Sequence, residues 1–219
     1  DKEFDAKVFR TKDRPIASGK ISIKQAIFYT LLLCFLALIV LLNFNNYTII
    51  LALASMPLAF TYPLMKRFTY WPQLFLGITF NYGLILGWTA IKGQIDIIAV
   101  IFYVGAIFWT LGYDTIYGYQ DIKDDEIIGL KSTSIKFKKK PFTLLFSCYS
   151  IFLLSLLTIG YLMALNKLSL IIFIFILIQM YFLQLKKLNI ESPINCLKIF
   201  KSNNYLGLIV LLCLLIGKN

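Results

Sequence analysis

The stretch Gly112-Tyr-Asp-Thr-Ile-Tyr-Gly-Tyr-Gln-Asp-Ile-Lys-Asp-Asp-Glu-Ile-Ile-Gly-Leu-Lys131-Ser132 places acidic residues at the end of a long apolar run. If it continues one helix at about 100° per residue, Asp114, Asp121 and Asp125 share a single stripe. Carboxylates that close together repel each other, and a cation between them keeps them ionised. Oxygen ligands alone suit Mg²⁺, which binds a few carboxylates together with substrate phosphate. The other interpretation is a solvated acidic loop that caps a helix.

The composition around this stretch is that of a membrane protein. Of the 219 residues, 59% are hydrophobic and only 15% are charged, and the mean hydropathy is +0.76. Runs of about 20 apolar residues are long enough to cross a bilayer. We therefore predict an all-α, polytopic transmembrane helix bundle forming one membrane domain over residues 1–219, with seven spans near 24–42, 47–64, 71–91, 95–119, 142–164, 167–186 and 203–217. The last run is short for a span.

The distribution of charge orients these spans. With the N-terminal segment on one side, all but three of the 22 Lys and Arg residues fall on that side, the exceptions being Lys92, Lys167 and Lys218. This asymmetry indicates that the N-terminal side is cytoplasmic. Among the acids, only Asp96 falls on the outer side. We expect the lipid bilayer, and no nucleic acid, to be the partner of this basic chain; the sequence does not indicate an oligomeric state.

Two residue types limit the possible chemistry. The chain has no histidine, which excludes His-ligated haem, the usual catalytic zinc sites and Ser-His-Asp catalysis. The four cysteines are not closely paired and mostly lie within apolar runs, so they predict packing rather than a disulfide or zinc site: Cys34, Cys148, Cys196 and Cys213. Carboxylates, basic side chains and tyrosines remain as the candidate functional groups.

Basic residues accompany the acids on the cytoplasmic side. Lys66 and Arg67 follow the second span, and Lys131 follows the acidic stretch, whereas the later run of lysines at 136–140 is typical of topology-setting charge. Near the N-terminus, acids and bases each repeat at a spacing of four: Asp1 and Asp5, then Arg10 and Arg14. Bases combined with metal-bound carboxylates suit a diphosphate, and the apolar chain behind them suits a lipid diphosphate. The alternative for the N-terminal segment is contact with anionic headgroups.

Three motifs together carry a resemblance to a family. They are Asp1-Lys-Glu-Phe-Asp5 with Arg14-Pro-Ile-Ala-Ser-Gly, Tyr62-Pro-Leu-Met-Lys-Arg with Trp71-Pro-Gln, and Tyr113-Asp-Thr-Ile-Tyr-Gly-Tyr-Gln-Asp-Ile-Lys-Asp-Asp with Gly129-Leu-Lys-Ser. The chain resembles the UbiA-type intramembrane prenyltransferases, and within them the 4-hydroxybenzoate polyprenyltransferase branch. The first motif lacks the leading Asn-Asp of the family's full form. The resemblance covers nearly the whole chain.

The resemblance implies a fold and a reaction. The family fold is a nine-helix bundle, so two spans are expected before the seven in this chain. The expected reaction is Mg²⁺-dependent transfer of a polyprenyl group from polyprenyl diphosphate to the ring of 4-hydroxybenzoate in ubiquinone biosynthesis. It would take place in the bacterial inner membrane, with the motif loops on the cytoplasmic side.

Matching positions imply roles for individual residues. Two Mg²⁺ ions are expected on Asp1, Asp5, Asp114, Asp121 and Asp125. The phosphate or the aromatic acid is expected on Arg10, Lys66, Arg67 and Lys131, and we expect Asp114, Asp121 and Arg67 to be catalytic. The rings of Tyr62, Tyr113 and Tyr117 would shield an allylic cation or simply pack. The amide of Asn81 would bind substrate or join two helices.

Other functions remain open at this stage. A sister enzyme of the same family, with a menaquinone precursor or haem as its substrate, would share these motifs. A CDP-alcohol phosphotransferase also uses carboxylates and Mg²⁺, but it gathers its acids in one compact, glycine-containing motif. A transporter would place ionisable groups near the middle of the bilayer, whereas here they gather at one interface.

Overall fold

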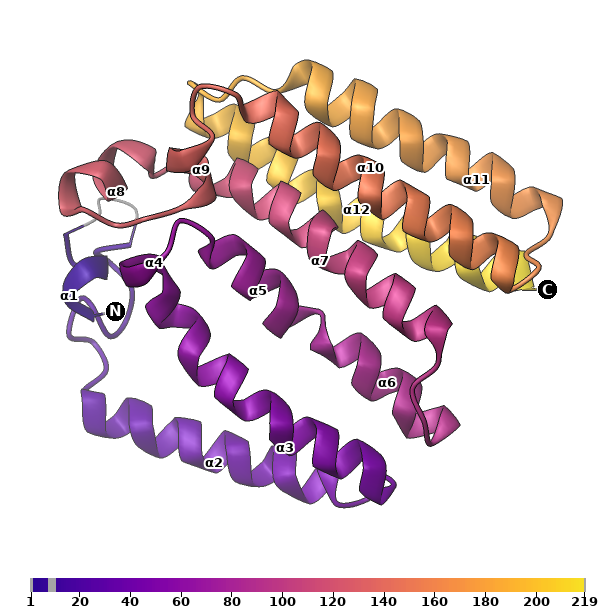
Figure 1. Cartoon of the computed structure of the whole chain (residues 1–219). Coiled ribbons are helices and arrows are strands. Elements are labelled where there is room, and N and C mark those ends of the chain that lie inside the picture. The colour runs from indigo at the N-terminus through magenta and orange to yellow at the C-terminus, as the bar shows by residue number, and fades with distance from the viewer. Residues whose placement is uncertain (1, 8–10, 219) are drawn as a thin grey trace.

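The computed structural model describes residues 2–7 and 11–218 and is a bundle of long helices (Figure 1). Seven helical segments in the described part are long and apolar enough to cross a membrane, as the sequence predicts. They are α2 (Ile23–Leu41), α3 with η1 and α4 (Asn46–Phe68), α5 with α6 (Pro72–Lys92), α7 (Ile97–Gly118), α10 (Pro141–Leu162), α11 with η2 and η3 (Lys167–Lys187), and α12 (Pro193–Lys218).

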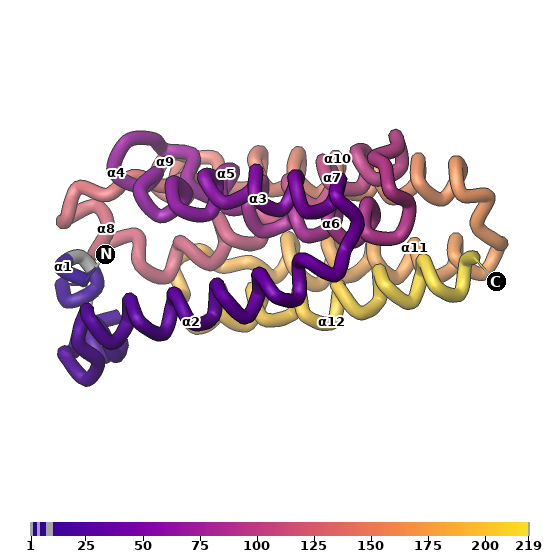
Figure 2. The backbone as a smooth tube through the Cα atoms, turned by 90° about the horizontal axis from the view of Figure 1, so that it is seen from below, coloured from indigo at the N-terminus to yellow at the C-terminus, as the bar shows by residue number. Residues whose placement is uncertain are grey.

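Three of these segments are interrupted. Their parts are α3 (Asn46–Thr61), η1 (Tyr62–Leu64) and α4 (Met65–Phe68); α5 (Pro72–Phe80) and α6 (Tyr82–Lys92); and α11 (Lys167–Ile178), the π-helical η2 (Gln179–Gln184) and η3 (Leu185–Lys187). The short helices α1 (Lys2–Asp5), α8 (Ile122–Ile128) and α9 (Thr133–Lys136) lie together with α4 at one end of the bundle (Figures 1 and 2). The motif loops therefore share one end, opposite the C-terminus.

The boundary predicted for the last span is wrong. Helix α12 begins at Pro193 rather than near 203, and it is the longest span of the chain, with 26 residues. The span was predicted to start at 203 because Lys198, Lys201 and Ser202 come before it, but the helix continues back through them to Pro193, and Asn203 is buried and hydrogen-bonded inside the bundle. A polar side chain with internal partners does not end a helix in a membrane.

Helix α7 is the centre of the bundle and contacts α5, α6, α10 and α12. Its glycines allow this close packing. A methyl group on Gly112 would stand 2.7 Å from the ring of Tyr149 on α10, and one on Gly105 would overlap Ser155 of the same helix. Small residues bring helix backbones together in membranes, where packing and hydrogen bonds hold the bundle.

A polar network crosses the interior of this packing. Gln184 is fully buried; it accepts a hydrogen bond from the hydroxyl of Tyr149 (2.6 Å) and donates to Ser202 (3.1 Å) and Asn203 (3.2 Å). The indole of Trp109 donates to the same Asn203 oxygen at 2.9 Å. These bonds join α7, α10, η2 and α12. In hydrocarbon no water replaces such partners, so the network specifies how the four elements align.

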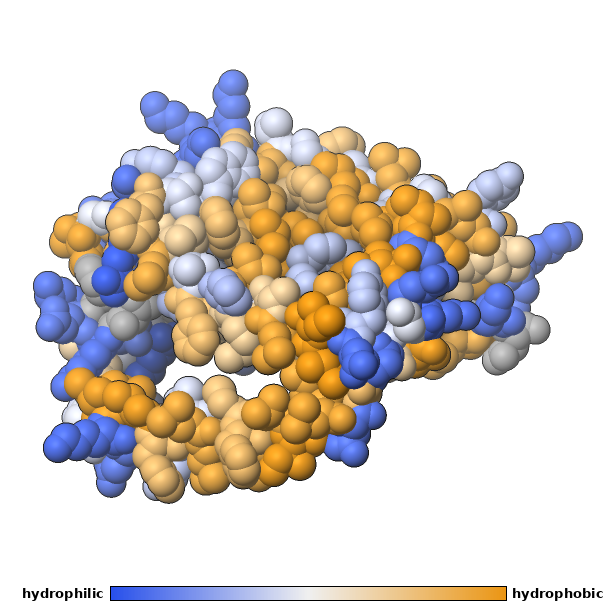
Figure 3. Space-filling model, turned by 60° about the horizontal axis from the view of Figure 1, so that its bottom comes forward, coloured by the Kyte–Doolittle hydropathy of each residue, from blue (hydrophilic) through white to orange (hydrophobic). Residues whose placement is uncertain are grey.

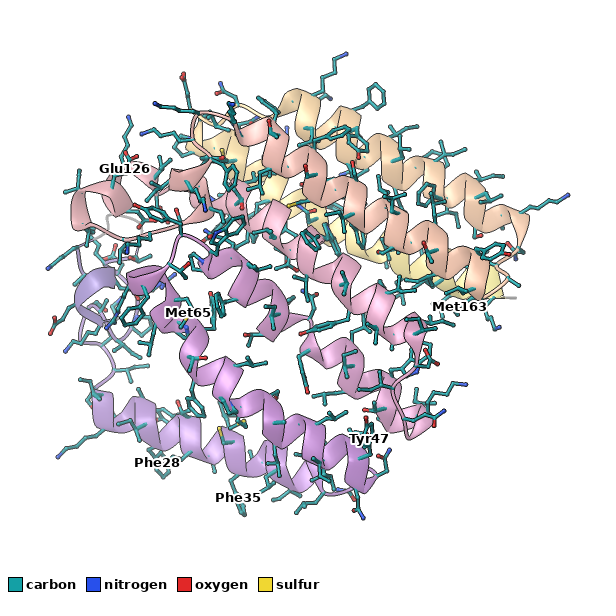
Figure 4. All side chains as sticks on the ribbon, in the orientation of Figure 1. Phe28, Phe35, Tyr47, Met65, Glu126 and Met163 are labelled. Atoms are coloured by element: carbon teal, nitrogen blue, oxygen red, sulfur yellow. The ribbon has the colours of Figure 1, made fainter. Side chains whose placement is uncertain are left out.

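Helix α2 stands apart from the remaining helices. None of its residues is buried, and Phe28 and Phe35 point away from the bundle (Figure 4). Its start is fixed by a capping box between Ser22 and Gln25. Figure 3 shows an opening between α2, which forms the apolar band along the lower edge, and the main body. The bundle is therefore open on this side along apolar surface.

Candidate active site

A pocket of about 140 Å³ lies at the end of the bundle that carries the motif loops. Its wall combines carboxylates, lysines and uncharged polar groups from three separate segments of the chain: Tyr62, Lys66, Pro72, Gln73, Asp114, Asp125, Leu130, Lys131 and Ser132. Five of these residues were predicted from the sequence as site residues. The pocket opens where the apolar spans meet the polar loops, which is the position expected for a lipid headgroup.

Asp114 enters the pocket from the last turns of α7 and is half-buried. Its carboxylate forms no hydrogen bond with the described residues. Tyr62 on η1 lies within electrostatic range of this carboxylate. A half-buried carboxylate without partners is costly. Such a group is therefore set up to interact with a cation or a ligand in the pocket.

The second carboxylate, Asp125, comes from α8, which is separated from α7 by a turn. The prediction of one continuous helix, with Asp114, Asp121 and Asp125 in a stripe, is wrong: α7 ends at Gly118 and α8 begins at Ile122. Asp114 and Asp125 nevertheless line one pocket, although a turn separates their helices. Asp121 occupies the N-cap position of α8 without capping it through its side chain, and it does not line this pocket.

The turn between α7 and α8 is packed into the bundle. Its first residue, Tyr119, is only 2% exposed and belongs to the hydrophobic core. Burial raises the pKa of its hydroxyl, which therefore stays protonated. Beside it, a methyl group on Gly118 would overlap the hydroxyl of Ser134, so glycine lets α9 pack against the end of α7. At the other end of α8, Gly129 has φ +78°, a conformation that favours glycine.

The loop after α8 is hydrogen-bonded to the segment after α3. The backbone N–H of Lys131 donates to the carbonyl of Lys66 at 2.9 Å, and the Lys131 ammonium donates to the Phe68 carbonyl at 3.3 Å. The ammonium of Lys136 lies 4.5 Å from the ring centroid of Trp71. These contacts place Lys66 and Lys131 on one pocket although they are far apart in sequence.

Gln73 completes this connection and was not predicted as a site residue. It is 7% exposed, lines the pocket, and accepts a hydrogen bond from the backbone N–H of Thr133 at 3.0 Å. The hydroxyl of Thr133 is itself 2.6 Å from that of Thr115 on α7. A polar residue near the start of an apolar span, in Trp71-Pro-Gln, was the available signal. Ser132 was also missed as a lining residue.

The N-terminal motif lies near the same end. Arg14 donates to both carboxylate oxygens of Asp5, at 3.0 and 3.1 Å. Lys66 is within electrostatic range of Asp5 and of Asp125, so the first and second acidic motifs converge on this lysine. Asp5 is held by Arg14 and, although predicted as a metal ligand, does not line the pocket. The predicted ligand Asp1 and the predicted phosphate-binding Arg10 lie outside the described residues.

Three other predicted site residues do not line this pocket. Arg67 is exposed. Tyr117 packs against Phe200 with ring centroids 4.5 Å apart, an arrangement that favours packing at this position. Asn81 stands at the break between α5 and α6, and its amide nitrogen donates to Gly77 (2.8 Å) and to Ala106 (3.2 Å) and Thr110 (2.8 Å) of α7. Those contacts favour helix joining over substrate binding for Asn81.

The donors of the pocket fit Mg²⁺ bound together with a substrate phosphate. Asp114 and Asp125 supply only oxygen, the donor that Mg²⁺ prefers. Within the described part of the chain, no three His, Cys, Asp or Glu side chains come close enough to form a metal site by themselves. Mg²⁺ usually takes one or two carboxylates and completes its shell with water and phosphate. The geometry therefore suits a metal that arrives with its diphosphate, with Lys66 and Lys131 balancing the remaining charge.

The similarity to curated relatives covers the whole chain. It is 40% identical over 219 residues to 4-hydroxybenzoate geranyltransferase 1 of Lithospermum erythrorhizon, covering 100% of this chain and 71% of that protein. It is 44% identical over 226 residues to the mitochondrial 4-hydroxybenzoate polyprenyltransferase of Homo sapiens, covering 99% of this chain and 58% of the human protein. The chain thus spans about three fifths of the human protein.

Solved structures have the same fold. The apo structure of a UbiA homologue from Aeropyrum pernix K1 superposes with a TM-score of 0.76 at 18% identity, covering 98% of this chain and 80% of that one. A digeranylgeranylglyceryl phosphate synthase superposes with a TM-score of 0.67 at 22% identity, covering 100% of this chain and 77% of that one. Residues 1–209 match the UbiA prenyltransferase family. A seven-span helix bundle with carboxylates and lysines around one terminal pocket, and this match over nearly its full length, show that the chain belongs to the UbiA prenyltransferase family.

Proposed function

We propose that the protein transfers a polyprenyl group from polyprenyl diphosphate to the ring of 4-hydroxybenzoate, with Mg²⁺, in ubiquinone biosynthesis. The observation that carries this proposal is the pocket that Asp114 and Asp125 line together with Lys66 and Lys131, at the polar end of an apolar bundle. The names of the relatives supply the acceptor and the class of donor. The single membrane domain over residues 1–219 would contain this site.

The proposed setting is the bacterial inner membrane, with the motif loops facing the cytoplasm. The protein is an integral, multi-pass membrane protein, and its charge asymmetry supports this orientation. A diphosphate headgroup would occupy the pocket while its polyprenyl chain follows apolar surface. The opening between α2 and the main body supports entry of such a chain from the side (Figure 3).

Binding of the donor would use charge on both sides of the pocket. Asp114 and Asp125, with Asp5 beside them, would hold Mg²⁺, as would Asp1 and Asp121 by family resemblance. When bound, the metal neutralises negative charge on the diphosphate and favours its departure. Lys66 and Lys131 would donate to the phosphate oxygens and stabilise the charge that builds on the leaving group. Arg10 and Arg67 would contribute positive potential at the same end.

Transfer would then proceed at the allylic carbon. As its bond to oxygen breaks, this carbon becomes cation-like, and the ring face of Tyr62 beside Asp114 would stabilise it. The electron-rich ring of 4-hydroxybenzoate attacks, a carbon–carbon bond forms, and the ring loses a proton. The dense loops over the pocket would keep water from capturing the cation. Lys131 is held by its contact with the Phe68 carbonyl, so its charge is positioned before substrate binds.

The test is turnover in a defined bilayer. The protein in lipid nanodiscs would receive Mg²⁺, polyprenyl diphosphates of several lengths, and a panel of aromatic acids that includes 4-hydroxybenzoate. We expect prenylated 4-hydroxybenzoate by mass spectrometry and little product from acceptors of other classes. Preference for a menaquinone precursor would assign the protein to a sister activity, and an absence of any prenylated product would refute the proposal.

A further inference from the structure

The amide of Gln73 has a fixed orientation that leaves its nitrogen without a partner. Its oxygen accepts the hydrogen bond of the Thr133 backbone N–H at 3.0 Å, and a backbone N–H can only donate. The side chain therefore cannot be flipped, and its –NH₂ group occupies the other position. Within the described residues no acceptor is bonded to this nitrogen.

The surroundings of this nitrogen make the missing partner significant. Gln73 is 7% exposed, and its nitrogen is not among the fully buried polar atoms that lack a partner, so the donor remains accessible from the pocket that the residue lines. The nitrogen lies 3.4 Å from the position that a methyl group on Gly118 would take. Gly118 and Asp114 are four residues apart on α7 and so share a face. The unpaired donor thus faces the end of α7 that carries the pocket carboxylate, and Gln73 lines that pocket.

We infer that Gln73 is a substrate-binding residue whose side-chain amide donates a hydrogen bond to an anionic oxygen of a substrate. The inference rests on the proposed prenyl transfer and adds a residue to it. Two substrate groups have this chemistry, the diphosphate of the donor and the carboxylate of the aromatic acid. A neutral donor suits the site because it binds an oxyanion without changing the charge balance between Asp114, Asp125 and the lysines.

The same side chain links substrate binding to loop position. Its oxygen holds the loop that carries Lys131 and Ser132, while its nitrogen is directed at the ligand. Two substitutions separate the roles. Gln73→Glu keeps an oxygen for the Thr133 N–H but removes both donors, and Gln73→Met removes donors and acceptor without adding charge. Thr133→Val is the matched control, because it breaks the 2.6 Å hydroxyl contact with Thr115 and loosens the loop while the backbone N–H remains.

The experiment compares the variants in nanodiscs by kinetics and by calorimetry. Loss of a hydrogen bond to a charged oxygen predicts an about 10- to 100-fold higher KM or lower kcat/KM in both Gln73 variants, with a small change in Thr133→Val. A rise confined to the KM for polyprenyl diphosphate assigns the diphosphate, and one confined to the KM for 4-hydroxybenzoate assigns the carboxylate. Melting temperatures identify any variant that does not fold, and the other Gln73 variant then gives the answer.

Two results would overturn the inference. One is wild-type kinetics in Gln73→Glu with a large loss in Thr133→Val, which would reduce Gln73 to a loop anchor. The other is unchanged calorimetric affinity of both folded Gln73 variants for a prenyl thiolodiphosphate and for 4-hydroxybenzoate. Failure of the proposed function looks different. The wild-type protein would then make no prenylated aromatic product, while binding of the thiolodiphosphate would still report on Gln73.

Discussion

Replacing Asp114 by Asn separates the function of this residue from the stability of the fold, because it removes a charge with almost no change in shape. The carboxylate is half-buried and forms no hydrogen bond with the described residues. Folding therefore loses no partner when the charge is removed, and it no longer has to desolvate an anion. We expect the melting temperature of Asp114→Asn to equal or exceed that of the wild type, as at other functional sites that cost stability.

Activity should respond in the opposite direction. Removing one group that stabilises transition-state charge costs about 2.7–4 kcal/mol, or about 10²- to 10³-fold in kcat. The assay measures prenyl transfer in nanodiscs at saturating Mg²⁺, together with thermal melts. Mg²⁺ with a prenyl thiolodiphosphate should raise the melting temperature of the wild type, and raise that of Asp114→Asn much less, because ligand stabilisation follows affinity.

Glu126→Gln is the matched control. Glu126 is also an acid at the polar end, but it points away from Met65 and α4 (Figure 4), pairs with Lys138 at 2.9 Å on the surface, and does not line the pocket. Its loss should leave kcat/KM within about twofold, because exposed ion pairs contribute little. The reasoning is refuted if Asp114→Asn keeps more than a tenth of wild-type activity, or if its activity falls only in proportion to lost folded protein.

Three further predictions concern charge, metal and packing. Lys66→Met should lower kcat/KM about 10- to 100-fold, because Lys66 lines the pocket. Lys139→Met, in a surface run of lysines, should change kcat/KM less than twofold. Equal losses of kcat/KM in the two variants across a salt titration would contradict this. Chelation with EDTA should abolish turnover and Mg²⁺ should restore it, whereas full turnover in EDTA would rule out the metal. Gly112→Ala should destabilise the protein by about 1–3 kcal/mol, because the added methyl would stand 2.7 Å from Tyr149, whereas Gly83→Ala faces open space and should not lower the melting temperature.

The sequence predicted the spans well because hydropathy averages over many residues. Seven runs of apolar residues appear as seven helical segments, three of them interrupted, and the charge asymmetry agrees with the gathering of motif loops at one end. The start of α12 was misjudged because Lys198, Lys201 and Ser202 lower the hydropathy ahead of Asn203. Only the structure shows that its side chain is bonded to Trp109 and Gln184 inside the bundle.

Most charged residues of the pocket could be predicted from the sequence, but the helix geometry and the role of Gln73 could not. Tyr62, Lys66, Asp114, Asp125 and Lys131 meet in one pocket, as their shared side of the membrane suggested. The predicted stripe was wrong because helical periodicity assumes one continuous helix, whereas α7 ends at Gly118 and α8 begins at Ile122. Gln73 was missed because its importance depends on a hydrogen bond to a loop 60 residues away, and no local pattern encodes such a partner.

The hydrogen bond between Trp109 and Asn203 fixes the register of α7 against α12. Asp114 lies five residues beyond Trp109, about 7.5 Å further along the axis. Sliding α7 past α12 by one turn, about 5.4 Å, would leave the indole and the amide facing hydrocarbon. The 2.9 Å contact thus opposes sliding of α7 along α12. In a Trp109→Phe protein this hydrogen bond is lost. The position of α7 along α12 should then be less uniform, and with it the distance between the pocket and the apolar surface that the prenyl chain follows.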